Sequence, residues 1–173
     1  MPSDLSRTLG DTSEHQQPFA PKMLLSMRPN VQLISNTRRF AGDLLGSVLN
    51  DPDATSRVTL AIHELLENTL KYSTDGRAEL ALLVGEECEG RRTVEVRASN
   101  RTTPEQAAEL CRRIDALGRA TDPMGLYVAM MRESVHREGS GLGLARIRVE
   151  GEMELSYALA GDEVTVSATA PLE

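Results

Sequence analysis

The chain has 173 residues, a net charge of −7, 40% hydrophobic and 3% aromatic residues, and no tryptophan. This length is enough for one domain with a full aliphatic core. The acidic balance, with no long run of Lys and Arg, argues against a nucleic-acid partner. No apolar run reaches the roughly 20 residues that a membrane-spanning helix needs, so we also expect no membrane contact.

The first 21 residues are polar and show no hydrophobic period. We therefore expect a flexible tail over residues 1–21 and a single domain over residues 22–173. The start of the chain lacks the apolar core of a signal peptide. Neither Cys88 nor Cys111 lies in a CxxC pair, which makes a zinc site improbable and favours a reducing compartment. These features together predict a cytoplasmic protein.

Hydrophobic periods of two and of 3.6 residues predict the elements of the domain. Strands are predicted at 23–27, 77–84, 93–99, 153–160 and 164–170. Helices are predicted at 31–49, from a cap at Asp53 or Thr55 to about Ser73, at 104–117 with a cap at Thr102 or Thr103, at 124–135, and directly after a glycine-rich loop at 138–143. Turns at 85–90 and 161–162 join strands into two hairpins. This order predicts an α+β two-layer sandwich in which helices cover one face of a mostly antiparallel mixed sheet.

Three polar side chains share one face of the second helix. Glu64, Asn68 and Lys71 stand at i, i+4 and i+7, beside the apolar stripe that faces the core. Asparagine is a mediocre helix former because its side chain competes for backbone hydrogen bonds. The face is therefore either a solvated surface, with a Glu67–Lys71 ion pair, or part of a functional site.

The glycine-rich loop is the second feature that suggests a site. Glycines at 139, 141 and 143 let the backbone approach a ligand closely, and the following helix offers free N–H groups and the positive end of its dipole. Such a loop suits phosphates, although it is also compatible with a hinge or an ordinary turn. It is not a P-loop, because Leu144 follows Gly143 where Lys is required. It is also not a dinucleotide fingerprint, because the third glycine and the parallel strand pattern are missing.

The sequence Glu64-x-x-x-Asn68, followed later by Gly139-x-Gly141-x-Gly143-Leu144, resembles the histidine-kinase-type ATPase superfamily that also contains Hsp90, gyrase B and MutL. The likeness is greatest to the short bacterial anti-sigma-factor serine kinases of the RsbW and SpoIIAB kind. It covers residues 23–170. It implies the Bergerat-type ATPase fold and the binding of Mg-ATP.

The resemblance implies a role for each matching residue. Asn68 would be the Mg²⁺ ligand, Glu64 the general base that orients water or an acceptor hydroxyl, and Lys71 a phosphate contact. The second glycine box would wrap the triphosphate beneath a mobile lid formed by residues 101–138. Its members here are Gly139, Gly141, Gly143 and Leu144.

The chain departs from this family at the first glycine box, Asp-x-Gly-x-Gly, whose Asp accepts a hydrogen bond from the adenine amino group. The corresponding segment, residues 98–104, contains neither Asp nor Gly. Asn100 could offer its amide oxygen instead, but a neutral acceptor is weaker than a charged one. The loss of one such contact costs about 1–3 kcal/mol, or ten- to hundredfold in affinity.

Two functions follow from the resemblance. The first is a cytoplasmic regulator that binds Mg-ATP and phosphorylates a Ser or Thr of a STAS-type antagonist protein, or sequesters a sigma factor. The second is a protein-binding module that keeps the ATPase fold without catalysis and acts by partner exchange alone. Kinases of this kind often form homodimers.

Overall fold

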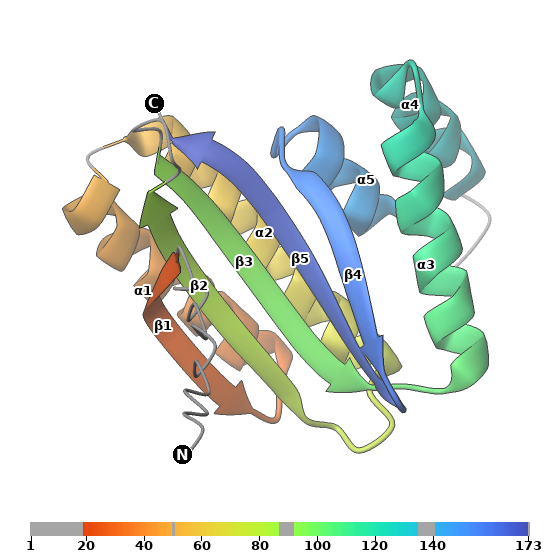
Figure 1. Ribbon diagram of the computed structural model, residues 1–173, viewed down its shortest axis with the longest axis horizontal. Coiled ribbons are helices and arrows are strands. Elements are labelled where there is room, and N and C mark those ends of the chain that lie inside the picture. Colours follow the sequence, from red (N-terminus) through yellow and green to blue (C-terminus); the bar gives the residue numbers. More distant parts are fainter. Residues whose placement is uncertain (1–18, 50, 87–91, 135–140, 173) are drawn as a thin grey trace, which may run out of the picture.

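A five-stranded sheet with the strand order β1-β2-β3-β5-β4 forms one layer of the computed structural model (Figure 1). The structure describes residues 19–49, 51–86, 92–134 and 141–172. Its strands are β1 (Phe19–Met27), β2 (Ala78–Glu86), β3 (Arg92–Arg101), β4 (Glu154–Ala160) and β5 (Glu163–Leu172). Every neighbouring pair is antiparallel. The predicted α+β sandwich is confirmed, with a described sheet that is wholly antiparallel rather than mixed.

Helices form the second layer. They are α1 (Val31–Leu49), α2 (Pro52–Tyr72), α3 (Pro104–Arg119), α4 (Pro123–Ser134) and α5 (Leu142–Val149). The long α2 runs behind the sheet and packs against β2, β3 and β5, with α1 on one side of it and α5 on the other (Figure 1). Helix α3 stands beyond the β4 edge and contacts both β4 and α5. No helix in these parts of the chain is long and apolar enough to cross a bilayer.

The core lies between α2 and the sheet and is aliphatic, as the shortage of aromatic residues predicts. On β2 and β3, alternate residues point toward the helices, since side chains of a strand alternate between its faces. Cross-strand partners such as Leu82 and Val96 are both fully buried. The largest fully buried side chains are Ile34, Leu45, Val58, Ile62, Leu65, Leu66, Leu80, Leu82, Leu117, Leu144, Ile147 and Met153.

Helix α2 begins earlier than predicted. Its N-cap is Asp51, whose carboxylate accepts a hydrogen bond from the N–H of Ala54 at 2.9 Å, and Pro52 occupies the first helical position. The predicted caps Asp53 and Thr55 are therefore wrong. Asp53 instead lies in the first turn, where a carboxylate favours the positive end of the helix dipole.

Two strand boundaries differ from the predictions, and one predicted cap is confirmed. Strand β1 begins at Phe19, so the last three residues of the predicted tail 1–21 belong to the sheet, and residues 1–18 lie outside the described residues. Strand β2 continues to Glu86, and the rest of the predicted turn at 85–90 falls outside the description. The cap of α3 is Thr103, one of the two predicted residues.

Candidate functional site

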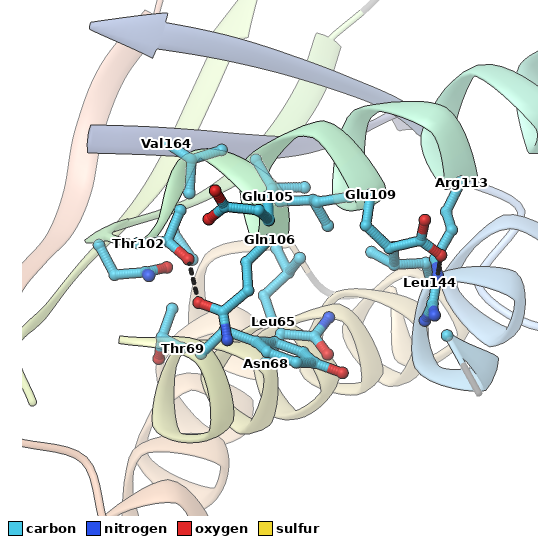
Figure 2. A pocket seen from close by; sticks show the side chains of 16 residues that line it. Leu65, Asn68, Thr69, Thr102, Glu105, Gln106, Glu109, Arg113, Leu144 and Val164 are labelled. Atoms are coloured by element: carbon cyan, nitrogen blue, oxygen red, sulfur yellow. Dashed lines mark hydrogen bonds and ion pairs between the residues drawn. The ribbon is translucent and has the colours of Figure 1, made fainter. Parts of the chain in front are cut away.

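A cavity of about 230 Å³ lies between α2 and α3, against the strands β3 and β5 (Figure 2). This volume is somewhat below the roughly 300–1,000 Å³ of common small-molecule clefts, so a ligand would be only partly enclosed. Most of its wall is apolar, and the polar groups are few. The lining residues are Leu65, Asn68, Thr69, Tyr72, Ala98, Asn100, Thr102, Glu105, Gln106, Glu109, Leu110, Arg113, Gly141, Leu144, Val164 and Val166.

Four residues that the sequence suggested as nucleotide ligands line this cavity. They are Asn68, Asn100, Gly141 and Leu144, and they come from α2, the end of β3 and the start of α5. The remaining candidates are placed differently.

Lys71 does not line the cavity. The Lys71 side chain is exposed, and its ammonium lies 5.7 Å from the centre of the Tyr72 ring, within reach of a weak cation–π interaction. Gly139 lies outside the described residues, as does the end of the predicted lid 101–138. The described part of that lid consists of α3 and α4, and α3 forms one wall of the cavity.

One end of the cavity is suited to an anion. Gly141 is the N-cap of α5, with φ of 69°, and no described side chain caps the free N–H groups of this turn. Arg113 reaches from α3 toward the same point, since a Cβ added to Gly141 would lie 2.7 Å from its Nη1. Its Nε also donates to Glu109 at 2.7 Å (Figure 2). A guanidinium beside an uncapped helix N-terminus is a favourable place for a phosphate group.

The other end is suited to a flat ring. Ala98, Val164 and Val166 provide an apolar floor on β3 and β5. Two amide groups accompany them. The Oε1 of Gln106 accepts a hydrogen bond from the Thr102 hydroxyl at 2.9 Å. The Nδ2 of Asn100 donates to the carbonyl of Arg101 at 3.0 Å, so the Asn100 oxygen remains as an acceptor.

Glu64 lies next to the cavity rather than in its lining, buried under the first turn of α5. One carboxylate oxygen forms an ion pair with Arg146 of α5. The other faces Gly143, where an added Cβ would collide with it. Burial raises the pKa of Glu64 above its ordinary value, and the nearby charge of Arg146 offsets this only in part.

Arg146 continues the network toward α4. Its Nη2 contacts Glu150 at 3.3 Å, and Glu150 also accepts a hydrogen bond from the hydroxyl of Tyr127. The hydrogen bond from Tyr127, followed by that from Arg146, lowers the pKa of Glu150. A chain of polar contacts therefore joins α2, α5 and α4, and connects the candidate base Glu64 to the described part of the lid.

No metal centre is preformed in the described parts of the chain, where no three His, Cys, Asp or Glu side chains gather closely enough to hold an ion. The side chain of Asn68 can supply one oxygen ligand from the cavity wall. This is compatible with Mg²⁺, which commonly binds through one or two protein ligands, substrate phosphates and water. The donor set therefore fits a magnesium ion that arrives with a triphosphate.

Sequence reasoning missed Arg113, Gln106, Arg146 and Tyr127. Gln106 stands three residues after Thr103, which is the spacing of a capping box and was a local signal. The other three stand in no motif, and each acts through a partner or a surface supplied by another element. Arg146 and Glu64, for example, are 82 positions apart.

Comparison with known proteins is informative only at the level of structure. No family model and no curated protein matches the chain. One of the solved structures that match is a chain of the SiaB–SiaC complex from Pseudomonas aeruginosa, with a TM-score of 0.61 and 17% sequence identity. The match covers 87% of this chain and 90% of the other. The two chains share a fold.

Proposed function

We propose that this protein binds Mg-ATP in the cavity between α2 and α3 and uses it to control a partner protein. The observation that carries the proposal is the convergence on one cavity of Asn68, Asn100, Gly141 and Leu144. They come from three separate segments of the sequence, and each was predicted as a nucleotide ligand from the resemblance to the ATPase superfamily. The end of the cavity with the apolar floor, which we call the apolar slot, suits the base of a nucleoside triphosphate. The anion-binding end suits its phosphates.

The two ends of the cavity bind different parts of the nucleotide. The free N–H groups of α5 and the Arg113 guanidinium bind the phosphates, while the apolar floor and Leu110 hold the base. Asn68 supplies a ligand to the magnesium ion. Mg-ATP supplies a transferable phosphoryl group whose charge the metal partly neutralises. The protein orients that group and excludes water from it.

Glu64 is the candidate general base. A carboxylate with a raised pKa accepts a proton more readily than an ordinary one, and burial acts in this direction here. One of its oxygens is held by Arg146. Proton transfer from a Ser or Thr hydroxyl would therefore use the other oxygen, which faces Gly143.

The partner that we propose is a STAS-type antagonist protein or a sigma factor, controlled by Ser/Thr phosphorylation, by sequestration or by both. A protein partner is supported by the structural neighbour, which was solved as part of a two-protein complex. A cytoplasmic location and a homodimer belong to the same proposal.

A second function has its own support. In a protein-binding module without catalysis, Glu64 would serve only as the buried partner of Arg146, which is its position here. The missing carboxylate at the end of β3 points in the same direction. Partner exchange would then carry the signal without phosphoryl transfer.

Calorimetric titration with ATP and Mg²⁺ tests nucleotide binding directly. We expect the wild type to bind, and Asn68→Ala to bind at least about tenfold more weakly only when Mg²⁺ is present. Asn36→Ala, on the exposed face of α1, is the matched control and should bind as the wild type does. No measurable binding to the wild type would reject nucleotide binding and kinase activity together.

Phosphoryl transfer separates the two functions. Radiolabelled ATP is incubated with this protein and a purified STAS-domain protein. Label transfer that Glu64→Gln abolishes supports the kinase. A stable complex that forms without transfer supports the binding module.

A further inference from the structure

The amide group of Gln106 has a fixed orientation. Its Oε1 accepts from the Thr102 hydroxyl at 2.9 Å and lies 3.5 Å from the backbone nitrogen of Thr103. A backbone N–H can only donate, so the oxygen and not the nitrogen must face it. These contacts form the capping box of α3, in which Thr103 is the N-cap. The Nε2 group must therefore point the other way.

That nitrogen points into the cavity. Gln106 is a lining residue, and Figure 2 shows its oxygen bonded to Thr102 and its nitrogen directed toward α2. The side chain stands near the end of the cavity floored by Ala98 and Val164. Gln106 thus presents a hydrogen-bond donor to the slot for a flat ring.

Asn100 presents the complementary group. Its Nδ2 is engaged with the carbonyl of Arg101, which leaves its oxygen as the acceptor available to a ligand. The two amides offer one donor and one acceptor in the same slot. Adenine carries an acceptor, N1, next to a donor, its 6-amino group. A 6-oxopurine carries the reverse, with N1–H next to O6.

We propose that Gln106 is the residue that selects adenine, by donating from Nε2 to N1 while the oxygen of Asn100 accepts from the 6-amino group. The selection does not require the carboxylate that is missing at the end of β3. This inference rests on the proposed nucleotide binding, and it identifies the base and the residue from α3 that recognises it.

The test compares ATP with ITP, which differ only in the 6-amino or 6-oxo purine edge. Affinities are measured by calorimetry with Mg²⁺ on the full chain. The wild type should bind ATP at least about tenfold more tightly than ITP, since a misplaced donor or acceptor costs about ten- to hundredfold.

The variant Gln106→Glu tests the role of the Nε2 donor by itself. Glutamate at this position keeps the capping box, so α3 should remain folded, but the group facing the slot becomes an acceptor. The added negative charge should weaken the binding of ATP and of ITP to the same extent, so its effect cancels in the ratio of the two affinities. The preference for ATP should fall at least about tenfold. The same change at an exposed position of α1, Gln32→Glu, is the control and should leave the ratio unaltered.

A second variant covers the case in which Gln106→Glu fails to fold. Thr102→Val removes the hydroxyl that orients the amide and keeps the shape of a buried side chain. It should also reduce the preference for ATP. A wild type that binds both nucleotides equally, or variants that leave the ratio unchanged, would overturn the role of Gln106 and leave nucleotide binding standing. Binding of neither nucleotide would overturn the proposed function itself, and this role with it.

Discussion

Removal of the Arg146 guanidinium should destabilise the protein in a pH-dependent way. The Glu64 side chain is only 8% exposed, and in Arg146→Ala its charge would stay buried without its partner. Breaking a fully buried ion pair costs about 3–5 kcal/mol. Because Arg146 itself is 35% exposed, solvent screening reduces this figure, and we expect a loss of about 1–3 kcal/mol in the free energy of unfolding at pH 8.

The sign of the pH dependence follows from the raised pKa of Glu64. The Glu64 carboxyl group binds its proton more strongly in the folded state than in the unfolded state. The stability that Glu64 contributes is therefore greatest below its ordinary pKa and is lost as the pH rises through the raised pKa. Loss of Arg146 raises the pKa further, because an opposite charge is removed. The deficit of Arg146→Ala should therefore shrink as the pH falls from 8 to 5.

Urea unfolding at pH 5, 6.5 and 8 measures this effect. The double variant Glu64→Gln with Arg146→Ala should recover most of the loss at pH 8, since no buried charge is left. Arg119→Ala is the control, because Arg119 is 81% exposed and its contact with Asp115 is long, at 3.4 Å. It should cost less than about 1 kcal/mol. An Arg146→Ala deficit that is equal at all three pH values, or that the double variant does not recover, would refute the reasoning.

Three other changes probe the caps and the anion-binding end. Asp51→Ala should cost about 0.5–2 kcal/mol in urea unfolding because it removes the N-cap of α2, whereas Asp53→Ala should cost less; equal losses would contradict this assignment. Gly143→Ala should cost about 1–3 kcal/mol in thermal unfolding, since its Cβ would collide with the buried carboxylate described above; an unchanged melting temperature would argue against that packing. Arg113→Ala should weaken Mg-ATP binding at least about tenfold in calorimetry, whereas Arg112→Ala, at a side chain 73% exposed, should not; equal effects would remove Arg113 from the proposed site.

The elements were predictable because their signals are local. The spacing of apolar residues predicted the first helix with the same bounds, Val31–Leu49, as the structure. Alternation at 93–99, 153–160 and 164–170, together with the leucine-rich run at 77–84, predicted both hairpins. The predicted cap of α2 was wrong because residues 50–53 were interpreted as a break in the chain. Pro52 is in fact suited to the first helical position, which favours Asp51 as the cap.

The candidate site was predictable in part for the same reason. Asn68 and Gly141 belong to short motifs whose residues lie within one helix or one loop, and both line the cavity. Lys71 shares the helix face of Asn68 in the sequence pattern, but its side chain is exposed and its ammonium lies near the Tyr72 ring. Helical spacing predicts a common face, yet only the packing of α3 and α5 decides where the cavity begins and ends.

The sequence alone determined the fold class, the aliphatic core and the two polar segments that border the cavity, because periodicity, composition and glycine spacing act over a few residues. The tertiary structure decided what those segments contact. It paired Glu64 with Arg146 across 82 positions, placed Arg113 over Gly141, and oriented Gln106 through Thr102. Such pairings depend on the distance and burial of side chains from separate elements, which exist only after the helices have packed on the sheet.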